Sequence, residues 1–253
     1  MSIEDIRRDL DLRAVGEIFY LRTLDQLTVN VLDGESGLPG WTRKHVAVHM
    51  INNAEALMRL LDWATTGVEN PMYPSRTVRD AEIEEGVATI EVSDVRGISH
   101  EVAVELAAAL PEPESPAWDA QVLNGRGEPI MAAAIPWMRA REALLHALDL
   151  NIGMTALDFP TAAVDRLLTD VETVWAARAE PANFLLHITD RPDRPELANY
   201  LLACGDAAAF SAEPVELTGE AAELVSFLLG RGWPRGQAPA GTSASVPQPP
   251  AWL

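Results

Sequence analysis

Apolar residues recur at helical spacing through the first 150 residues, and this pattern restricts the fold more than any other feature of the sequence. Residues 3–31 carry apolar side chains mostly three or four positions apart. Thr42 is a candidate N-cap for a second helix that ends near Thr65, and further helices are predicted over 95–110 and 135–150. Four amphipathic helices predict a bundle, whose core can hold a site built from facing side chains.

The pattern changes after Gly153, where a helical segment is followed by short apolar runs bounded by turn residues. Helices are predicted over 161–179 and 220–229, and strands over 184–190, 199–206 and 214–219. Mixed helices and strands indicate a small second domain, so the predicted class is a two-domain α+β protein. The predicted domains are 1–155 and 160–235, followed by a Pro/Ala/Ser-rich tail at 236–253 that cannot form a core.

Loops are predicted where residues that end helices cluster. DGESGLPG (33–40) separates the first two helices, and NPMYPSRTVRD (70–80) is predicted to be irregular because of its prolines. The closing PPAWL contains Trp252 and Leu253, two side chains that are able to dock on a folded surface.

Composition restricts the partners of the chain. Its 19 Lys and Arg against 38 Asp and Glu give a net charge of −19, which disfavours binding to nucleic acid or to anionic lipid. The single cysteine, Cys204, excludes an internal disulfide and suits a reducing compartment. No apolar run reaches the roughly 18 residues of a membrane span, and the N-terminus lacks a signal-peptide pattern. These features predict a soluble, cytoplasmic protein.

The run REALLHALDL (141–150) places an acid and a histidine four residues apart. Glu142 and His146 lie on one face of a helix, where they are either a weak surface ion pair or part of a site. The second helix contributes His49, with Asn53 one turn further on the same face. Two imidazoles and a carboxylate form a three-ligand set suited to catalytic zinc with an open fourth position. His45 is a competing ligand, so spacing alone leaves the metal site undecided.

Two long stretches point to a family. GWTRKHVAVHMINNAEALMRLLDWATTGVENPMY (40–73) and PWMRAREALLHALDL (136–150) closely resemble the mycothiol-dependent maleylpyruvate isomerases, and the similarity extends to GRG (230–232) and VPQPPAWL (246–253). The resemblance implies an N-terminal DinB-like four-helix bundle and a smaller C-terminal α/β domain similar to sterol-carrier folds. It also implies zinc held by His49, Glu142 and His146.

The resemblance further implies conversion of maleylpyruvate to fumarylpyruvate, a step of gentisate breakdown, with mycothiol as cofactor. A thiolate that adds to the double bond leaves a single bond, which rotates before the thiolate is expelled. Cys204 lies among apolar residues and is a poor nucleophile, so an external low-molecular-weight thiol is required. Zinc is expected to ligate the thiol sulfur, with polarisation of a substrate oxygen as the alternative.

The substrate is a dicarboxylate, so cationic side chains are expected around it. Arg231 matches an arginine that the family uses, although a solvated arginine at a helix end is the alternative. Arg79 is a second candidate anchor, equally compatible with a surface ion pair. Tyr73 and Asn53 are candidate hydrogen-bonding groups for substrate or thiol.

Two other functions remain open at this point. Related DinB-like proteins transfer mycothiol onto an electrophile without releasing it, and such an S-transferase would need the same metal and thiol. A non-catalytic small-molecule-binding protein is the third possibility, since its second domain resembles sterol-carrier folds. Stoichiometric zinc in the purified protein distinguishes the enzymes from the binding protein.

Overall fold

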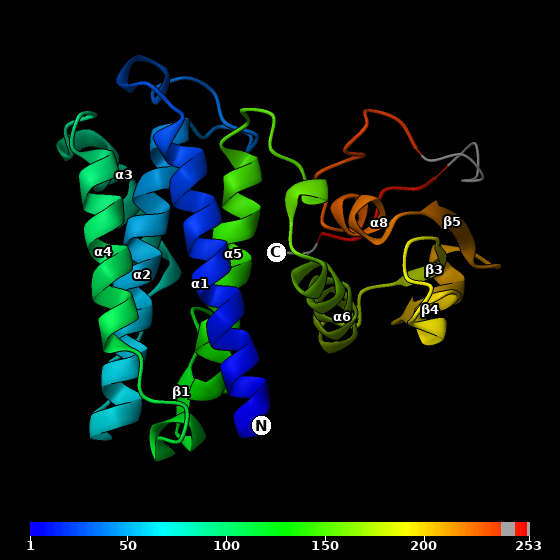
Figure 1. The fold of residues 1–253 in the computed structure, drawn as a ribbon, viewed down its shortest axis with the longest axis horizontal. Helices are drawn as coiled ribbons and strands as arrows, with labels where there is room; N and C mark the ends of the chain where they lie inside the picture. Colours follow the sequence, from blue (N-terminus) through cyan, green and yellow to red (C-terminus); the bar gives the residue numbers. More distant parts are fainter. Residues whose placement is uncertain (239–245, 252–253) are drawn as a thin grey trace. The chain divides into compact units, whose positions relative to one another are not determined.

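A computed structural model covers the chain, with residues 1–238 and 246–251 described (Figure 1). The chain divides into two compact units, Met1–Met154 and Thr155–Leu253. Part of the predicted tail, 239–245, lies outside the described residues, as do Trp252 and Leu253 of the closing PPAWL.

The first unit is built mainly from helices. They are α1 (Ile3–Asp25), α2 (Arg43–Thr66), α3 (Arg76–Thr89), α4 (Val95–Ala109) and α5 (Ile135–Asp149), with a hairpin of β1 (Gln121–Leu123) and β2 (Pro129–Met131) before α5. Short 3₁₀ turns lie at Val29–Val31, Pro116–Asp119 and Ala132–Ala134. Helix α1 packs along α5, and α2 packs along α4 and α5, so these four helices form the predicted bundle (Figure 1).

Local capping chemistry sets the ends of the helix that carries the predicted His49. The Thr42 hydroxyl accepts a hydrogen bond from the His45 backbone N–H, as predicted for an N-cap, and the Thr42 backbone N–H donates to His45 Nδ1 at 3.2 Å. Gly67 ends the helix in the left-handed conformation with φ +73°, where a side chain would be strained. These caps fix where α2 begins and ends, and therefore the position of His49 along the axis of the bundle.

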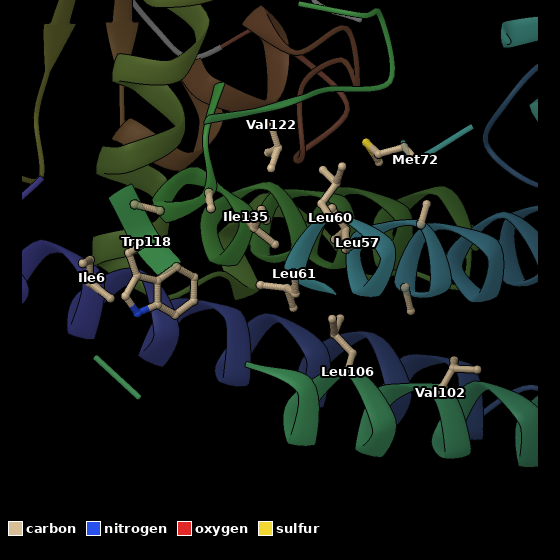
Figure 2. Packing of buried hydrophobic residues seen from close by; sticks show 14 of the residues in the cluster. Ile6, Leu57, Leu60, Leu61, Met72, Val102, Leu106, Trp118, Val122 and Ile135 are labelled. Atoms are coloured by element: carbon tan, nitrogen blue, oxygen red, sulfur yellow. The ribbon is translucent and has the colours of Figure 1, made fainter. Parts of the chain in front are cut away.

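The bundle core is continuous from α2 to its neighbours (Figure 2). Leu57, Leu60 and Leu61 of α2 are almost fully buried, and Leu61 points toward Leu106 of α4. Trp118, which precedes the hairpin, is 1% exposed and donates its indole N–H to the Glu112 carbonyl at 2.9 Å. Burying each large apolar side chain contributes about 1.5–3 kcal/mol, so this cluster holds α2 and α5 firmly in place.

The prediction that 70–80 is irregular is wrong for its second half. Irregular backbone ends at Ser75, whose hydroxyl accepts from the Val78 N–H and starts α3. Both prolines precede the helix and therefore do not interrupt it. Ile83 is the buried residue of this helix. The apolar face of α3 is therefore too narrow to give a helical pattern that can be recognised in the sequence.

The second unit is a small α/β structure. Its elements are α6 (Thr161–Ala177), β3 (Ala182–Ile188), β4 (Tyr200–Cys204), α7 (Ala207–Phe210), β5 (Val215–Gly219) and α8 (Ala221–Leu228), with 3₁₀ turns at Ala156–Asp158 and Pro195–Leu197. In the described residues the strand order is β4-β3-β5, antiparallel between β3 and β4 and parallel between β3 and β5. Phe184 of β3 contacts both Trp175 of α6 and Phe227 of α8.

The two-domain α+β class predicted from the sequence is therefore confirmed. Among the described residues, no helix combines the length and apolar character that crossing a bilayer requires.

Candidate metal centre

Helices α2 and α5 bring the three predicted ligands together. His49 Nε2 lies 3.1 Å from Glu142 Oε2, and His146 Nε2 lies 3.3 Å from the same oxygen. One ligand atom from each residue lies within 4.8 Å of the others. The two imidazole rings stand edge to face with centroids 4.7 Å apart. Three donors aimed at one point are the arrangement that a metal ion with an open coordination position requires.

Burial and pairing set the protonation states of the three groups. Burial lowers the pKa of His49 to about 4. Burial opposes ionisation of Glu142, but hydrogen bonds to His146 and His49 outweigh it and hold the pKa well below its usual value. Burial likewise opposes a charge on His146, yet its hydrogen bonds with Asp149 and Glu142 raise its pKa. In the metal-free protein, His49 is therefore neutral at neutral pH and Glu142 is a carboxylate.

The second nitrogen of each imidazole has a different neighbour. His146 Nδ1 lies 2.9 Å from Asp149 Oδ2, and His49 Nδ1 lies 3.3 Å from Arg79 Nη2. The ring of Trp41 packs against His49 with centroids 5.7 Å apart. These contacts restrict how each ring can rotate.

The structure brings Tyr73 and Arg79 to this part of the first unit. Arg79, on α3, also pairs with Asp80 at 2.9 Å, and 27% of the Arg79 side chain is exposed. The Tyr73 hydroxyl is buried beside Arg79, and burial raises its pKa to about 12. Arg59 supports the Tyr73 loop: its Nε donates to the Met72 carbonyl at 3.0 Å, and its guanidinium lies 5.8 Å from the Tyr73 ring centroid.

Asn53 lies one turn beyond His49 but belongs to a buried network. Its Oδ1 accepts from Arg139 Nη1 at 2.9 Å. The same guanidinium forms a two-point ion pair with Glu17 at 2.7 and 2.8 Å and donates to the Met50 carbonyl at 2.8 Å. Sequence reasoning missed Arg139 and Glu17, because only the packing of α1 on α5 makes them neighbours.

Arg231 lies in the second unit, just after α8. Its backbone N–H donates to the Ser226 carbonyl at 2.9 Å, and its Nη1 donates to the Leu229 carbonyl at 2.8 Å. These bonds hold the guanidinium beside the last turn of α8. Its role toward a substrate stays a prediction.

The remaining histidines have other partners. His45 Nδ1 lies 2.7 Å from the Thr42 hydroxyl, as part of the α2 cap. His100 Nε2 lies 3.1 Å from Asp25, and His187 Nδ1 lies 2.8 Å from Asn199. Within the described residues, the group of His, Cys, Asp and Glu side chains close enough to hold a metal is therefore His49, Glu142 and His146.

Fold and centre together define a class: a four-helix bundle with a His/Glu/His metal-type set on two neighbouring helices, followed by a small α/β unit. The family description "Mycothiol maleylpyruvate isomerase N-terminal domain" matches residues 17–151. The chain belongs to this mycothiol maleylpyruvate isomerase family, which confirms the resemblance noted in the sequence and the isomerase class.

Two solved structures agree over the whole chain. One is the crystal structure of the mycothiol-dependent maleylpyruvate isomerase, with 30% identity, a TM-score of 0.84 and complete coverage of both chains. The second is a histidine-to-alanine mutant of the mycothiol-dependent maleylpyruvate isomerase, with the same identity, TM-score and coverage. A search of curated proteins gave no match.

Proposed function

We propose that the chain is a zinc- and mycothiol-dependent isomerase that converts maleylpyruvate to fumarylpyruvate. The observation that carries the proposal is the convergence of His49 Nε2, His146 Nε2 and Glu142 Oε2 on one point. Family membership and the whole-chain likeness to a mycothiol-dependent maleylpyruvate isomerase supply the substrate and the thiol.

The donor set fits zinc. Two imidazole nitrogens and one carboxylate oxygen are the N/O ligands of a catalytic zinc site, and the absence of cysteine argues against a closed structural site. His49 is neutral in the metal-free protein and Glu142 is ionised, so two of the three groups already have the charge that a metal ligand requires. When bound, zinc would supply a positive charge that favours the thiolate form of a thiol.

The chain itself lacks a suitable nucleophile, which supports the need for an external thiol. Burial raises the pKa of Cys204, and its Sγ contacts the Glu172 carbonyl in the second unit. A buried neutral thiol is inert toward electrophiles. Mycothiol would supply the thiolate that adds to the double bond and leaves after rotation, which suits a reducing cytoplasm.

Four side chains are proposed to bind and orient the ligands. Arg79 lies beside His49 and is partly exposed, so it suits one substrate carboxylate. The Tyr73 hydroxyl is buried beside Arg79, which can only donate, so its own O–H is available as a hydrogen-bond donor. Arg231 is assigned to the other carboxylate through the family resemblance. Asn53, one turn after His49 on α2, orients the ligands indirectly, through its contact with Arg139.

One assay tests the proposed function. The ultraviolet absorbance of maleylpyruvate is followed with the purified protein, with and without mycothiol, and before and after removal of metal by a chelator. We expect isomerisation only when mycothiol and metal are both present, with recovery when zinc is returned. Unchanged turnover after chelation would contradict the proposal, and a stable thiol conjugate as product would identify an S-transferase.

A further inference from the structure

The α5 helix carries a second buried carboxylate, Asp149, behind the metal centre. It lies one turn after His146, so the motif reads Glu142-x-x-x-His146-x-x-Asp149. Its Oδ2 lies 2.9 Å from His146 Nδ1, and the residue is 3% exposed. The two nitrogens of an imidazole point away from each other, so this carboxylate contacts the side of the ring opposite to Glu142.

The backbone around Asp149 is held from two other segments. The Asp149 carbonyl accepts a hydrogen bond from the Gly37 N–H at 2.7 Å, which joins the end of α5 to the 33–40 loop. Arg43, in the first turn of α2, donates from Nε to the Leu150 carbonyl at 2.8 Å. The last turn of α5 is therefore fixed by the loop and by α2, and the Asp149 carboxylate has a defined place beside His146.

This geometry has a direct consequence for the His146 ring. If Nε2 is a metal ligand, then the one proton of the neutral ring has to lie on Nδ1. A carboxylate at hydrogen-bond distance accepts that proton and stops the ring from rotating. Asp149 is therefore placed to hold the His146 ring in the orientation that ligation through Nε2 requires.

We propose that Asp149 is a positioning residue of the metal centre, which holds His146 with Nε2 directed at the metal. The inference rests on the proposed zinc site and adds a residue that acts on the metal only through His146. On the other side of the centre, the neighbour that the described part of the chain gives His49 Nδ1 is the cationic Arg79 and not a carboxylate. Loss of Asp149 is therefore not compensated from α2.

The test is zinc affinity, measured on the full-length protein by competition with a chromophoric chelator. We expect Asp149→Ala to raise the zinc dissociation constant by about 10- to 100-fold, the usual effect of losing such a partner. Asp149→Asn keeps an oxygen that accepts from Nδ1–H, so it should recover part of the affinity. The partial recovery separates positioning from a general loss of structure, because both variants remove the same buried charge.

Asp25→Ala is the matched control. Asp25 lies 3.1 Å from His100 in a similar pair, but both side chains are nearly half exposed and lie outside the centre. We expect this variant to bind zinc as the wild type does. Circular dichroism of each metal-free variant establishes that it is folded, and Asp149→Asn carries the test if Asp149→Ala does not fold.

Wild-type zinc affinity in both Asp149 variants would overturn this inference and leave the proposed function standing. A wild-type protein that binds no zinc would overturn the proposed function first, and this inference with it. Nitrogen NMR of the zinc-loaded protein adds a second readout. It should show the proton of His146 on Nδ1 in the wild type, and exchange or rotation of that ring in Asp149→Ala.

Discussion

At the scale of single residues, the centre consists of two imidazoles that contact the same carboxylate oxygen, Oε2 of Glu142. Both Nε2 atoms lie within 3.3 Å of Glu142 Oε2, so the three groups proposed as metal ligands are already in contact. In the metal-free protein, that oxygen accepts hydrogen bonds from the ring nitrogens. A metal ion bound by the three groups would take the place of these hydrogen bonds.

Removing any one ligand tests the set. We expect His49→Ala, Glu142→Ala and His146→Ala each to lose bound zinc and activity while the helical circular dichroism is kept, because two ligands hold zinc far more weakly than three. Metal analysis of the purified variants provides the measurement. His45→Ala serves as the control, since His45 belongs to the α2 cap and should leave zinc bound. Full activity in any one of the three variants would remove that residue from the set.

Metal binding should also release a proton from one ligand only. Burial lowers the pKa of His49 to about 4, so it has no proton to lose at pH 6.5. His146 has a raised pKa and is still protonated there, so zinc must displace its proton. Zinc affinity should therefore weaken by up to about tenfold per unit as the pH falls through the pKa of His146.

Calorimetric titration with zinc in buffers of different ionisation enthalpy counts the protons released. The expected count exceeds one half at pH 6.5 and rises toward one as the pH is lowered. The His187→Gln variant should give the same values because His187 pairs with Asn199 and not with the proposed ligands. A count of two would mean that His49 is also protonated, contrary to its burial. No dependence on the buffer would mean that His146 is already neutral.

At the scale of elements, the bundle is joined by a buried ion pair. Arg139 of α5 and Glu17 of α1 are 2% and 4% exposed, and the same guanidinium bonds to the Met50 carbonyl of α2. An ion pair of this kind is costly to break by removing one partner, because the other charge stays buried without compensation. The pair therefore fixes α1, α2 and α5 relative to one another, close to the candidate metal centre.

We expect Glu17→Ala to lower the free energy of unfolding by about 3–5 kcal/mol. Replacing both partners together, as Glu17→Leu with Arg139→Met, should cost much less, since no buried charge is left alone. Urea unfolding followed by circular dichroism measures the difference. Glu114→Ala removes the exposed pair with Arg7 and should cost no more than about 1 kcal/mol. A Glu17→Ala variant as stable as Glu114→Ala would contradict this account of the bundle.

Elements with strong local signals could be predicted from the sequence. Thr42 marks the start of α2 because capping chemistry is local, and the spacing of Glu142 and His146 places both on one helix face. Helix α3 was missed because it buries little more than Ile83, and the β1–β2 hairpin because its strands have three residues each. The roles of Arg139 and Asp149 follow from contacts made only after folding.

At the scale of the whole molecule, the proposed function requires an acidic chain to bind an acidic substrate. With a net charge of −19, the general field opposes a dicarboxylate, so individual arginines must supply the attraction. Arg79, beside His49, is the arginine proposed for this role in the first unit. The second unit offers Arg231, which the family resemblance assigns to the substrate.

We expect Arg231→Ala to keep its zinc and to lower kcat/KM by about 10- to 100-fold, the effect of losing one charge-assisted hydrogen bond. Steady-state kinetics beside metal analysis separate the two effects. Arg235→Ala is the control from the same segment, because Arg235 pairs with Glu220 and Glu223 and should leave turnover unchanged. Normal kinetics in Arg231→Ala would contradict a role of this residue in substrate binding.

The central claim is that His49, Glu142 and His146 hold one zinc ion. Diffraction from crystals of the zinc-loaded protein at the zinc absorption edge tests it most directly. The account predicts one strong anomalous peak at about 2.0–2.2 Å from both Nε2 atoms and a Glu142 oxygen. Density without a peak at this position, or a peak bound by other side chains, would contradict it.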